Sequence, residues 1–196
     1  MSDLRPDLAV IAAHIEPGSR VLDIGCGDGA LMLALRDKGC DVRGIELDGA
    51  CVERCVAQGL SVVQGDANRD LIDYPDGGFD YAVLSQTLQA AARPDQVLDH
   101  LLRVGTRAFV SFPNFAHWRT RTALMFGGRM PVTRALPVSW YETPNIHHVT
   151  VTDFRELARE RDARIENEWF FADQRRVRAG GANWRADHAV FELQRS

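Results

Sequence analysis

The chain has 196 residues, of which 45% are hydrophobic and 26% are charged. This composition is close to that of an average soluble protein and excludes disordered, collagen-like and coiled-coil proteins. The net charge of −4 excludes the basic footprint of nucleic-acid binding, and no apolar run approaches the roughly 20 residues of a membrane span.

Helix and strand patterns alternate along most of the chain. In chain order we expect a helix at 8–15, a strand at 21–24, a helix at 30–38, a strand at 42–46, a helix at 49–58, strands at 61–64 and 79–84, a helix at 94–103, a strand at 107–112, a helix at 152–161, and strands at 165–171 and 189–193. Asp7 is expected to cap the first helix, and Thr150 with Asp153 the last. Gly39 suits the left-handed position after the second helix.

This alternation predicts a doubly wound, mostly parallel α/β sheet of about seven strands in a single domain, 1–196. The last two strands flank Gly180-Gly181 and are expected to form an antiparallel pair at the sheet edge. The arginines at 175, 176 and 178 indicate a solvated turn or, alternatively, a contact with an acidic partner.

Residues 113–150 interrupt the alternation. They contain four of the eight prolines, several aromatic residues, four arginines and one acid, Glu142. A long connection in a compact domain is usually functional or disordered, and the aromatic content argues against disorder. We expect an ordered cap or partner surface. For Trp118 and Trp140, packing onto the sheet and contact with a partner both stay open.

The residues 1–7 show no basic region followed by an apolar run, so we expect a cytoplasmic protein without a signal peptide. The four cysteines are expected to be reduced thiols. Cys51 and Cys55 could share a helix face, but no second Cys/His pair has the spacing of a zinc site. We therefore expect no metal.

The strongest motif is the sequence VLDIGCGDG at 21–29, in which a buried strand runs into three alternate glycines. Glycines allow a ligand to approach the backbone closely, here at the carboxyl end of the first strand. The spacing matches neither the dinucleotide fingerprint nor the phosphate loop.

Glu46 ends the second strand, where a carboxylate can accept both ribose hydroxyls of an adenosine. Asp66 follows the third strand, where a carboxylate can accept from an adenine amino group or cap the next helix.

These motifs, together with GIELD, GDA and FDYAVLSQTL, resemble the class I S-adenosylmethionine-dependent methyltransferases. The resemblance implies a Rossmann-like fold and a site for S-adenosylmethionine or S-adenosylhomocysteine. It places the glycines and Asp23 at the methionine moiety, Glu46 at the ribose, Leu47 on the adenine, and Ser85 and Gln86 near the sulfonium. The implied cofactor-binding residues are Asp23, Gly25, Cys26, Gly27, Gly29, Glu46, Leu47, Asp66, Ala67, Ser85 and Gln86.

The whole chain resembles the methionine biosynthesis protein MetW family, by LSQTLQA and by the blocks SFPNFAHWR and WYETPNIH. The resemblance implies a role in methionine synthesis with a homoserine O-acyltransferase of the α/β-hydrolase type as partner. The resemblance does not establish a methyl-transfer reaction. Two functions stay open: a methyltransferase-fold subunit that supports the acyltransferase, and an active methyltransferase acting on a small molecule. We expect neither a membrane nor a nucleic-acid partner, and homo-oligomers stay open.

Catalytic residues are not identified. Many O-methyltransferases carry Glu-His after the fourth strand, where this chain has Gln89-Ala90, and neither residue is a general base. Among the histidines of 113–150, at 117, 147 and 148, a general base is conceivable, but we expect them to hold loop structure. His14, His100 and His188 are expected on helix or strand surfaces without a functional role. Methyl transfer by the chain alone is therefore expected to be weak or absent.

Overall fold

Eight strands form one sheet in the order β3-β2-β1-β4-β5-β8-β6-β7 in the computed structural model, which describes residues 4–133 and 136–195. The strands are β1 Arg20–Ile24, β2 Asp41–Glu46, β3 Ser61–Gln64, β4 Phe79–Ser85, β5 Gly105–Pro113, β6 Ala163–Ala172, β7 Arg175–Val177 and β8 His188–Arg195. The helices are α1 Pro6–His14, α2 Ala30–Asp37, α3 Gly49–Ala57, α4 Ala67–Asp70, α5 Pro94–Val104, α6 Trp118–Gly127, α7 Val151–Glu160 and α8 Ala182–Arg185, with short 3-10 turns η1 Leu71–Asp73 and η2 Leu88–Ala90.

Strands β1 to β5 pair in parallel, which confirms the doubly wound sheet. Strands β6 and β8 form the predicted antiparallel pair. The pair is not at the sheet edge, however, because β8 lies between β5 and β6, and the short strand β7 forms the edge. Arg175 and Arg176 belong to β7 and pair with β6, so the interpretation of this arginine cluster as a turn is wrong.

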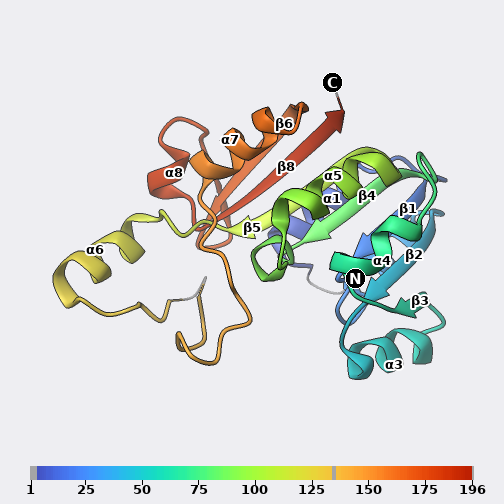
Figure 1. The fold of residues 1–196 in the computed structure, drawn as a ribbon, viewed down its shortest axis with the longest axis horizontal. Coiled ribbons are helices and arrows are strands. Elements are labelled where there is room, and N and C mark those ends of the chain that lie inside the picture. The colour runs from blue at the N-terminus through green and yellow to red at the C-terminus, as the bar shows by residue number, and fades with distance from the viewer. Residues whose placement is uncertain (1–3, 134–135, 196) are drawn as a thin grey trace.

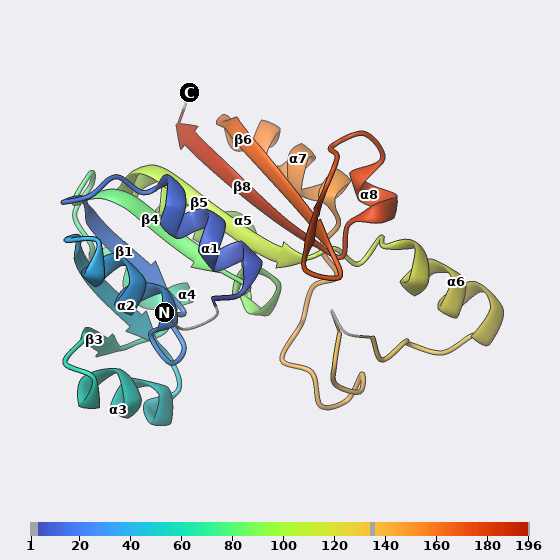
Figure 2. The same cartoon turned by 180° about the vertical axis from the view of Figure 1, so that it is seen from behind.

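The helices cover the two faces of the sheet and bury two apolar clusters. Helices α5 and α7 lie on the face toward the viewer in Figure 1, and α1 and α2 lie on the opposite face, seen in Figure 2. Side chains alternate along β1. Leu22 and Ile24 therefore join the cluster with α5 and α7, while Val21 joins the cluster with α1 and α2. Asp23, between them, lies on the α1 side, beside Leu8 and Leu31.

Local signals at two helix ends have the predicted geometry. Gly39, just after α2, has a φ of +85°, which suits glycine because it has no Cβ. Thr150 caps α7, since its hydroxyl accepts the N–H of Asp153. Such caps supply hydrogen bonds to N–H groups that lack partners within the helix.

Residues 113–150, which we call the arm, extend from the sheet between β5 and α7. Figures 1 and 2 both show α6 projecting away from the rest of the protein. The arm contacts the turn η2, which follows β4. There the N–H groups of Ile146 and His147 donate to the carbonyl of Gln89, at 2.9 and 3.0 Å. The Phe115 N–H donates to the Val149 carbonyl at 3.0 Å and closes its base.

In the part of the chain that the structure describes, no helix is both long and apolar enough to span a membrane.

Candidate functional site

The loop between β1 and α2 carries glycines at positions where side chains would not fit. Gly25 has a φ of +72°, and a Cβ atom there would lie 2.4 Å from the Oγ1 atom of Thr87. Gly27 has a φ of +58° and open space beside it. Glycine adopts this backbone region without steric cost. The loop therefore offers bare backbone to a ligand at the end of β1.

Two cavities adjoin at this loop. The loop cavity, of about 480 Å³, lies between the glycine loop and the start of α1. The strand-end cavity, of about 220 Å³, lies at the carboxyl ends of β2 and β3. Gly25, Gln86 and Thr87 line both. Together they make an elongated hollow at the switch point of the sheet, where ligands bind in open α/β folds.

Ten of the eleven residues that the sequence indicates as cofactor-binding line this hollow. The loop cavity has Asp23, Gly25, Cys26, Gly27, Ser85 and Gln86. The strand-end cavity has Glu46, Leu47, Asp66 and Ala67, and again Gly25 and Gln86.

Gly29 lines neither cavity. It precedes α2 with a φ of +81°, and a Cβ atom there would lie 2.4 Å from Leu60 Cδ1 and 3.0 Å from Cys55 Sγ. The glycine thus allows α2 to begin against the segment between α3 and β3. The motif alone does not distinguish a glycine that faces a ligand from one that allows close packing.

Asp23 carries a buried carboxyl that lines the loop cavity, and the residue is 2% exposed. No hydrogen bond to this carboxyl is found among residues 4–133 and 136–195. Burial raises the pKa of Asp23 from 3.8 to about 7, with Arg5 lowering it and Glu46 raising it. A cationic group in the loop cavity would supply the partner that the carboxylate lacks.

Glu46 holds the glycine loop from the end of β2. Its carboxylate accepts the Gly27 N–H at 2.8 Å with one oxygen and the Asp48 N–H at 2.9 Å with the other. A carboxylate has about four lone-pair sites, so each oxygen can accept one more hydrogen bond. Glu46 therefore links the two cavities and can still receive hydroxyl groups in the strand-end cavity.

Asp66 has the capping role that the sequence left open. One oxygen of Asp66 accepts two hydrogen bonds from Asn68, at the start of α4. The backbone N–H of Asn68 donates at 2.9 Å and the side-chain amide of Asn68 donates at 2.7 Å. The residue still lines the strand-end cavity beside Ala67. Leu47 is 66% exposed at the same cavity, an unusual exposure for leucine that a flat apolar ligand would cover.

The expectation that Asp7 caps the first helix is wrong. Asp7 lies inside the first turn of α1 and is only 4% exposed. Its carboxylate accepts the hydroxyl of Ser85 at 3.2 Å, the hydroxyl of Ser111 at 3.0 Å and the amide of Gln86 at 3.3 Å. Arg5 pairs with it at 3.3 Å. This cluster fixes the ends of β4 and β5 to the start of α1.

Sequence reasoning missed Arg5 and Thr87, which both line the loop cavity. Arg5 donates to the Ser85 hydroxyl at 3.0 Å, 80 residues away along the chain. Thr87 donates to the Ser85 carbonyl at 3.0 Å. An arginine before a helix has no local signal that indicates this contact, whereas Thr87 belongs to the fourth-strand motif and could have been included.

The histidines of the arm do not face the hollow just described. His117 is buried, and burial lowers its pKa. His148 packs against Phe115 with the two rings tilted and their centroids 4.1 Å apart. Gln89 donates to the Gln86 carbonyl at 2.7 Å. The contacts of His117, His148 and Gln89 are structural, and none of these three residues lines the loop cavity.

His188 lies on a strand as expected, at the start of β8. Its Nδ1 atom lies 2.9 Å from the Asp187 carboxylate, and its ring lines a third cavity with Arg5, Asp7 and Gln86. A histidine in contact with a carboxylate therefore lies beside the hollow formed by the loop and strand-end cavities. Strand alternation could not indicate this, because the residue is the first of β8 and the wall opposite comes from α1.

Cys51 and Cys55 face different partners. The Cys51 Sγ atom lies 3.3 Å from the Asp48 carboxylate, and the Cys55 Sγ atom lies 3.3 Å from the Gly27 carbonyl. Within the two described ranges, no group of three or more His, Cys, Asp or Glu side chains could hold a metal ion.

Known proteins share this fold. A crystal structure of an S-adenosylmethionine-dependent methyltransferase from Archaeoglobus fulgidus superposes with a TM-score of 0.73 at 15% identity, over 96% of this chain and 91% of that chain. Magnesium protoporphyrin IX methyltransferase from Synechocystis, solved with bound S-adenosylhomocysteine, superposes with a TM-score of 0.68 at 17% identity, over 96% of this chain and 80% of that chain. At these identities the similarity shows the fold alone.

Sequence similarity is more specific. The bifunctional methionine biosynthesis protein MetXA/MetW of Rhodopirellula baltica is 33% identical over 98% of this chain, which spans only 33% of that protein's length. The profile of the family described as methionine biosynthesis protein MetW matches residues 5–193. Since this match covers nearly the whole described chain, the protein belongs to the MetW family.

Proposed function

We propose that this MetW-family chain binds S-adenosylmethionine or S-adenosylhomocysteine across the loop and strand-end cavities and supports a homoserine O-acyltransferase of the α/β-hydrolase type. The observation that carries the cofactor is Asp23, a buried carboxyl in the loop cavity with no hydrogen-bond partner among the residues that the structure describes. Burying such a group is costly unless a ligand pairs with it. The ammonium group of the cofactor's methionine moiety is the matching cation.

The strand-end cavity suits the other end of the same ligand. Glu46 has acceptor sites left for the ribose hydroxyls, and Leu47 is exposed where an adenine ring would cover it. Asp66 and Ala67 lie beside it, at positions where an adenine amino group and ring edge can be received. When bound, S-adenosylmethionine would supply an electrophilic methyl group near Ser85 and Gln86, while the residues of this chain bind and orient it.

The fused relative supports the partnership. In Rhodopirellula baltica the sequence similar to this chain is about a third of a protein whose name joins MetXA to MetW. Fusion keeps two functions at a high effective concentration, which matters for functions that operate together. We take the MetXA part as the acyltransferase partner of this chain.

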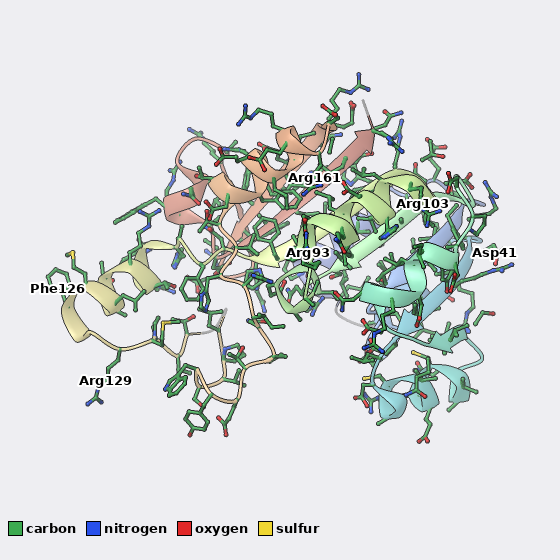
Figure 3. All side chains as sticks on the ribbon, viewed as in Figure 1. Asp41, Arg93, Arg103, Phe126, Arg129 and Arg161 are labelled. Atoms are coloured by element: carbon green, nitrogen blue, oxygen red, sulfur yellow. The ribbon has the colours of Figure 1, made fainter. Side chains whose placement is uncertain are left out.

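The arm offers the surface for that partner. Its most exposed large apolar side chains are Met125, Phe126, Trp140 and Tyr141, each at least 71% exposed. In Figure 3, Phe126 and Arg129 lie at the far end of the arm and point away from the sheet. Exposed aromatic residues of this kind are typical of binding hot spots. Arg129, near these side chains, is also exposed, so this part of the arm fits a partner face that is apolar and acidic.

Two measurements test the two parts of the proposal. Isothermal titration of the chain with S-adenosylhomocysteine tests the site, and absence of binding at millimolar ligand refutes it. Co-purification with a homoserine O-acyltransferase, with its activity assayed with and without this chain, tests the partnership. An acyltransferase that neither binds the chain nor changes its rate refutes the second part. Turnover of labelled S-adenosylmethionine in the same mixtures would instead favour an active methyltransferase.

A further inference from the structure

A third cavity, which we call the side cavity, lies next to the loop cavity. The proposed cofactor site does not include it. Its volume is about 230 Å³, and it shares Arg5 and Gln86 with the loop cavity. Its other walls come from the turn between β6 and β7, the start of β8 and Pro137 of the arm. A cavity of this size is below the roughly 300 Å³ at which sites for drug-sized ligands begin, so it suits a smaller molecule.

One end of the side cavity is rich in acceptors. Asp187, 7% exposed, holds the Nδ1 atom of His188 with one oxygen, at 2.9 Å, and accepts the Asp173 N–H with the other, at 2.8 Å. Burial opposes its ionisation, but the bonds from His188 and Asp173 outweigh burial and lower the pKa of Asp187. In the neutral imidazole, the contact of Nδ1 with the Asp187 carboxylate places the proton on Nδ1, and Nε2 is then an acceptor. No partner for Nε2 is found among the described residues.

Asp173 adds a second carboxylate to this end. One of its oxygens pairs with Arg119 of the arm at 3.1 Å, and the residue lines the side cavity. With the carboxylates of Asp173 and Asp187 in its wall, this part of the cavity favours a cationic donor such as an ammonium group.

Arg5 presents a guanidinium to the same cavity. Arg5 uses its Nε atom on Asp7 at 3.3 Å and its Nη2 atom on Ser85 at 3.0 Å. Its Nη1 atom has only the Gln86 side-chain oxygen at 3.5 Å, at the limit of a hydrogen bond. Nη1 therefore has donors available for a carboxylate, the group that a guanidinium binds best.

The backbone around the side cavity is held in a costly conformation. Four residues other than glycine have a positive φ in the described chain, and three of them line this cavity: Gln86 at +50°, Asp173 at +48° and Gln174 at +68°. Asp173 and Gln174 form the two-residue turn between β6 and β7, a position usually given to Asn-Gly. Strained backbone conformations of this kind cluster at active sites and ligand-binding sites.

We propose that the side cavity binds a small α-amino acid, with its ammonium group against His188 and Asp173 and its carboxylate against Arg5. Both poles of such a zwitterion find a matching group, and the volume leaves room for a short side chain. Because Arg5 and Gln86 also line the loop cavity, the amino acid and the cofactor change each other's affinity, by the same factor in both directions. The amino-acid site stands on its own residues, and only this coupling rests on the proposed cofactor site.

Three probes of nearly equal size test the two poles. L-2-aminobutyrate carries both charges, butyrate lacks the ammonium group, and propylamine lacks the carboxylate. In titrations of the full chain we expect L-2-aminobutyrate to bind, and each one-charge probe to bind roughly tenfold more weakly or worse, as expected for the loss of a charged hydrogen bond. L-Homoserine and L-methionine then define the side chain preferred.

Variants separate this site from the cofactor site. Asp173→Asn keeps the shape of the turn, and His188→Ala removes the acceptor; both should weaken amino-acid binding roughly tenfold and leave S-adenosylhomocysteine binding unchanged. Glu46→Ala should do the reverse. Circular dichroism and thermal unfolding verify that each variant is folded.

The failures are distinguishable. If S-adenosylhomocysteine binds but no amino acid binds at millimolar concentration, the side-cavity proposal is wrong and the cofactor proposal stands. If amino acids bind but S-adenosylhomocysteine does not, the cofactor proposal falls and the side cavity stands. Equal binding of the zwitterion and its one-charge analogues also overturns the side-cavity proposal.

Discussion

Replacing Asp23 by asparagine should stabilise the free protein above neutral pH and at the same time remove cofactor binding. The carboxyl is 2% exposed, and its pKa is about 7 in the folded chain against an ordinary value of 3.8. Each tenfold change in proton affinity is worth about 1.4 kcal/mol, so ionising Asp23 costs on the order of 4 kcal/mol more in the folded chain than in the unfolded one.

The sign follows from which state holds the proton more tightly. The folded chain does, so the group's contribution to stability is complete below about pH 4 and is lost as pH rises toward 7. Asp23→Asn carries no such charge. We therefore expect its unfolding free energy to exceed that of the wild type at pH 8 and to match it near pH 4.

Cofactor binding should show the opposite dependence. Below pH 7 Asp23 must release a proton before it can pair with an ammonium group, so the affinity for S-adenosylhomocysteine should fall about tenfold per pH unit. Thermal unfolding with and without ligand from pH 5.5 to 8.5, and titration in two buffers of different ionisation enthalpy, measure stability and proton release. An affinity independent of pH, or wild-type binding by Asp23→Asn, would refute the reasoning.

Three further outcomes test other parts of the molecule. Glu46→Ala should weaken S-adenosylhomocysteine binding by about 1.5–3 kcal/mol in titration, because charge-assisted hydrogen bonds are lost; an unchanged affinity would contradict this role. Gly25→Ala should abolish binding, since a Cβ atom 2.4 Å from Thr87 Oγ1 forces the loop to move; an alanine variant that binds normally would show that the loop is adaptable. Trp140 is 72% exposed, so Trp140→Ala should leave the melting temperature nearly unchanged. It should weaken the free energy of binding to the acyltransferase by about 2 kcal/mol or more, which co-purification would show as a loss of the complex. Ile72→Ala, 65% exposed outside the arm, is the matched control, and equal loss in both variants would contradict the assignment of the arm.

The sheet could be predicted because its signals are local. Buried strands and amphipathic helices have periods that are visible within about ten residues, and Gly39 and Thr150 mark helix ends by their own chemistry. The glycine loop and Glu46 could be placed together because each follows a parallel strand, and such strands end at one edge. None of these inferences required knowledge of contacts between distant segments.

The residues that were misread take their roles from distant segments. Asp7 resembles a helix cap in the sequence, but its partners Ser85 and Ser111 lie 78 and 104 residues away. The strand β7 is only three residues long and follows a turn that lacks the usual glycine, so neither periodicity nor turn chemistry indicates it.

The environment of His188 also depends on topology. The sequence predicted an antiparallel pair but not which of its two strands lies next to β5. Because β8 lies between β5 and β6, His188 pairs in register with Pro113 at the end of β5. This register places the imidazole in the cavity that Gln86 and Arg5 also line. The imidazole of a strand residue thereby lines a cavity, because β8 lies next to β5 and the start of α1 supplies another part of the wall.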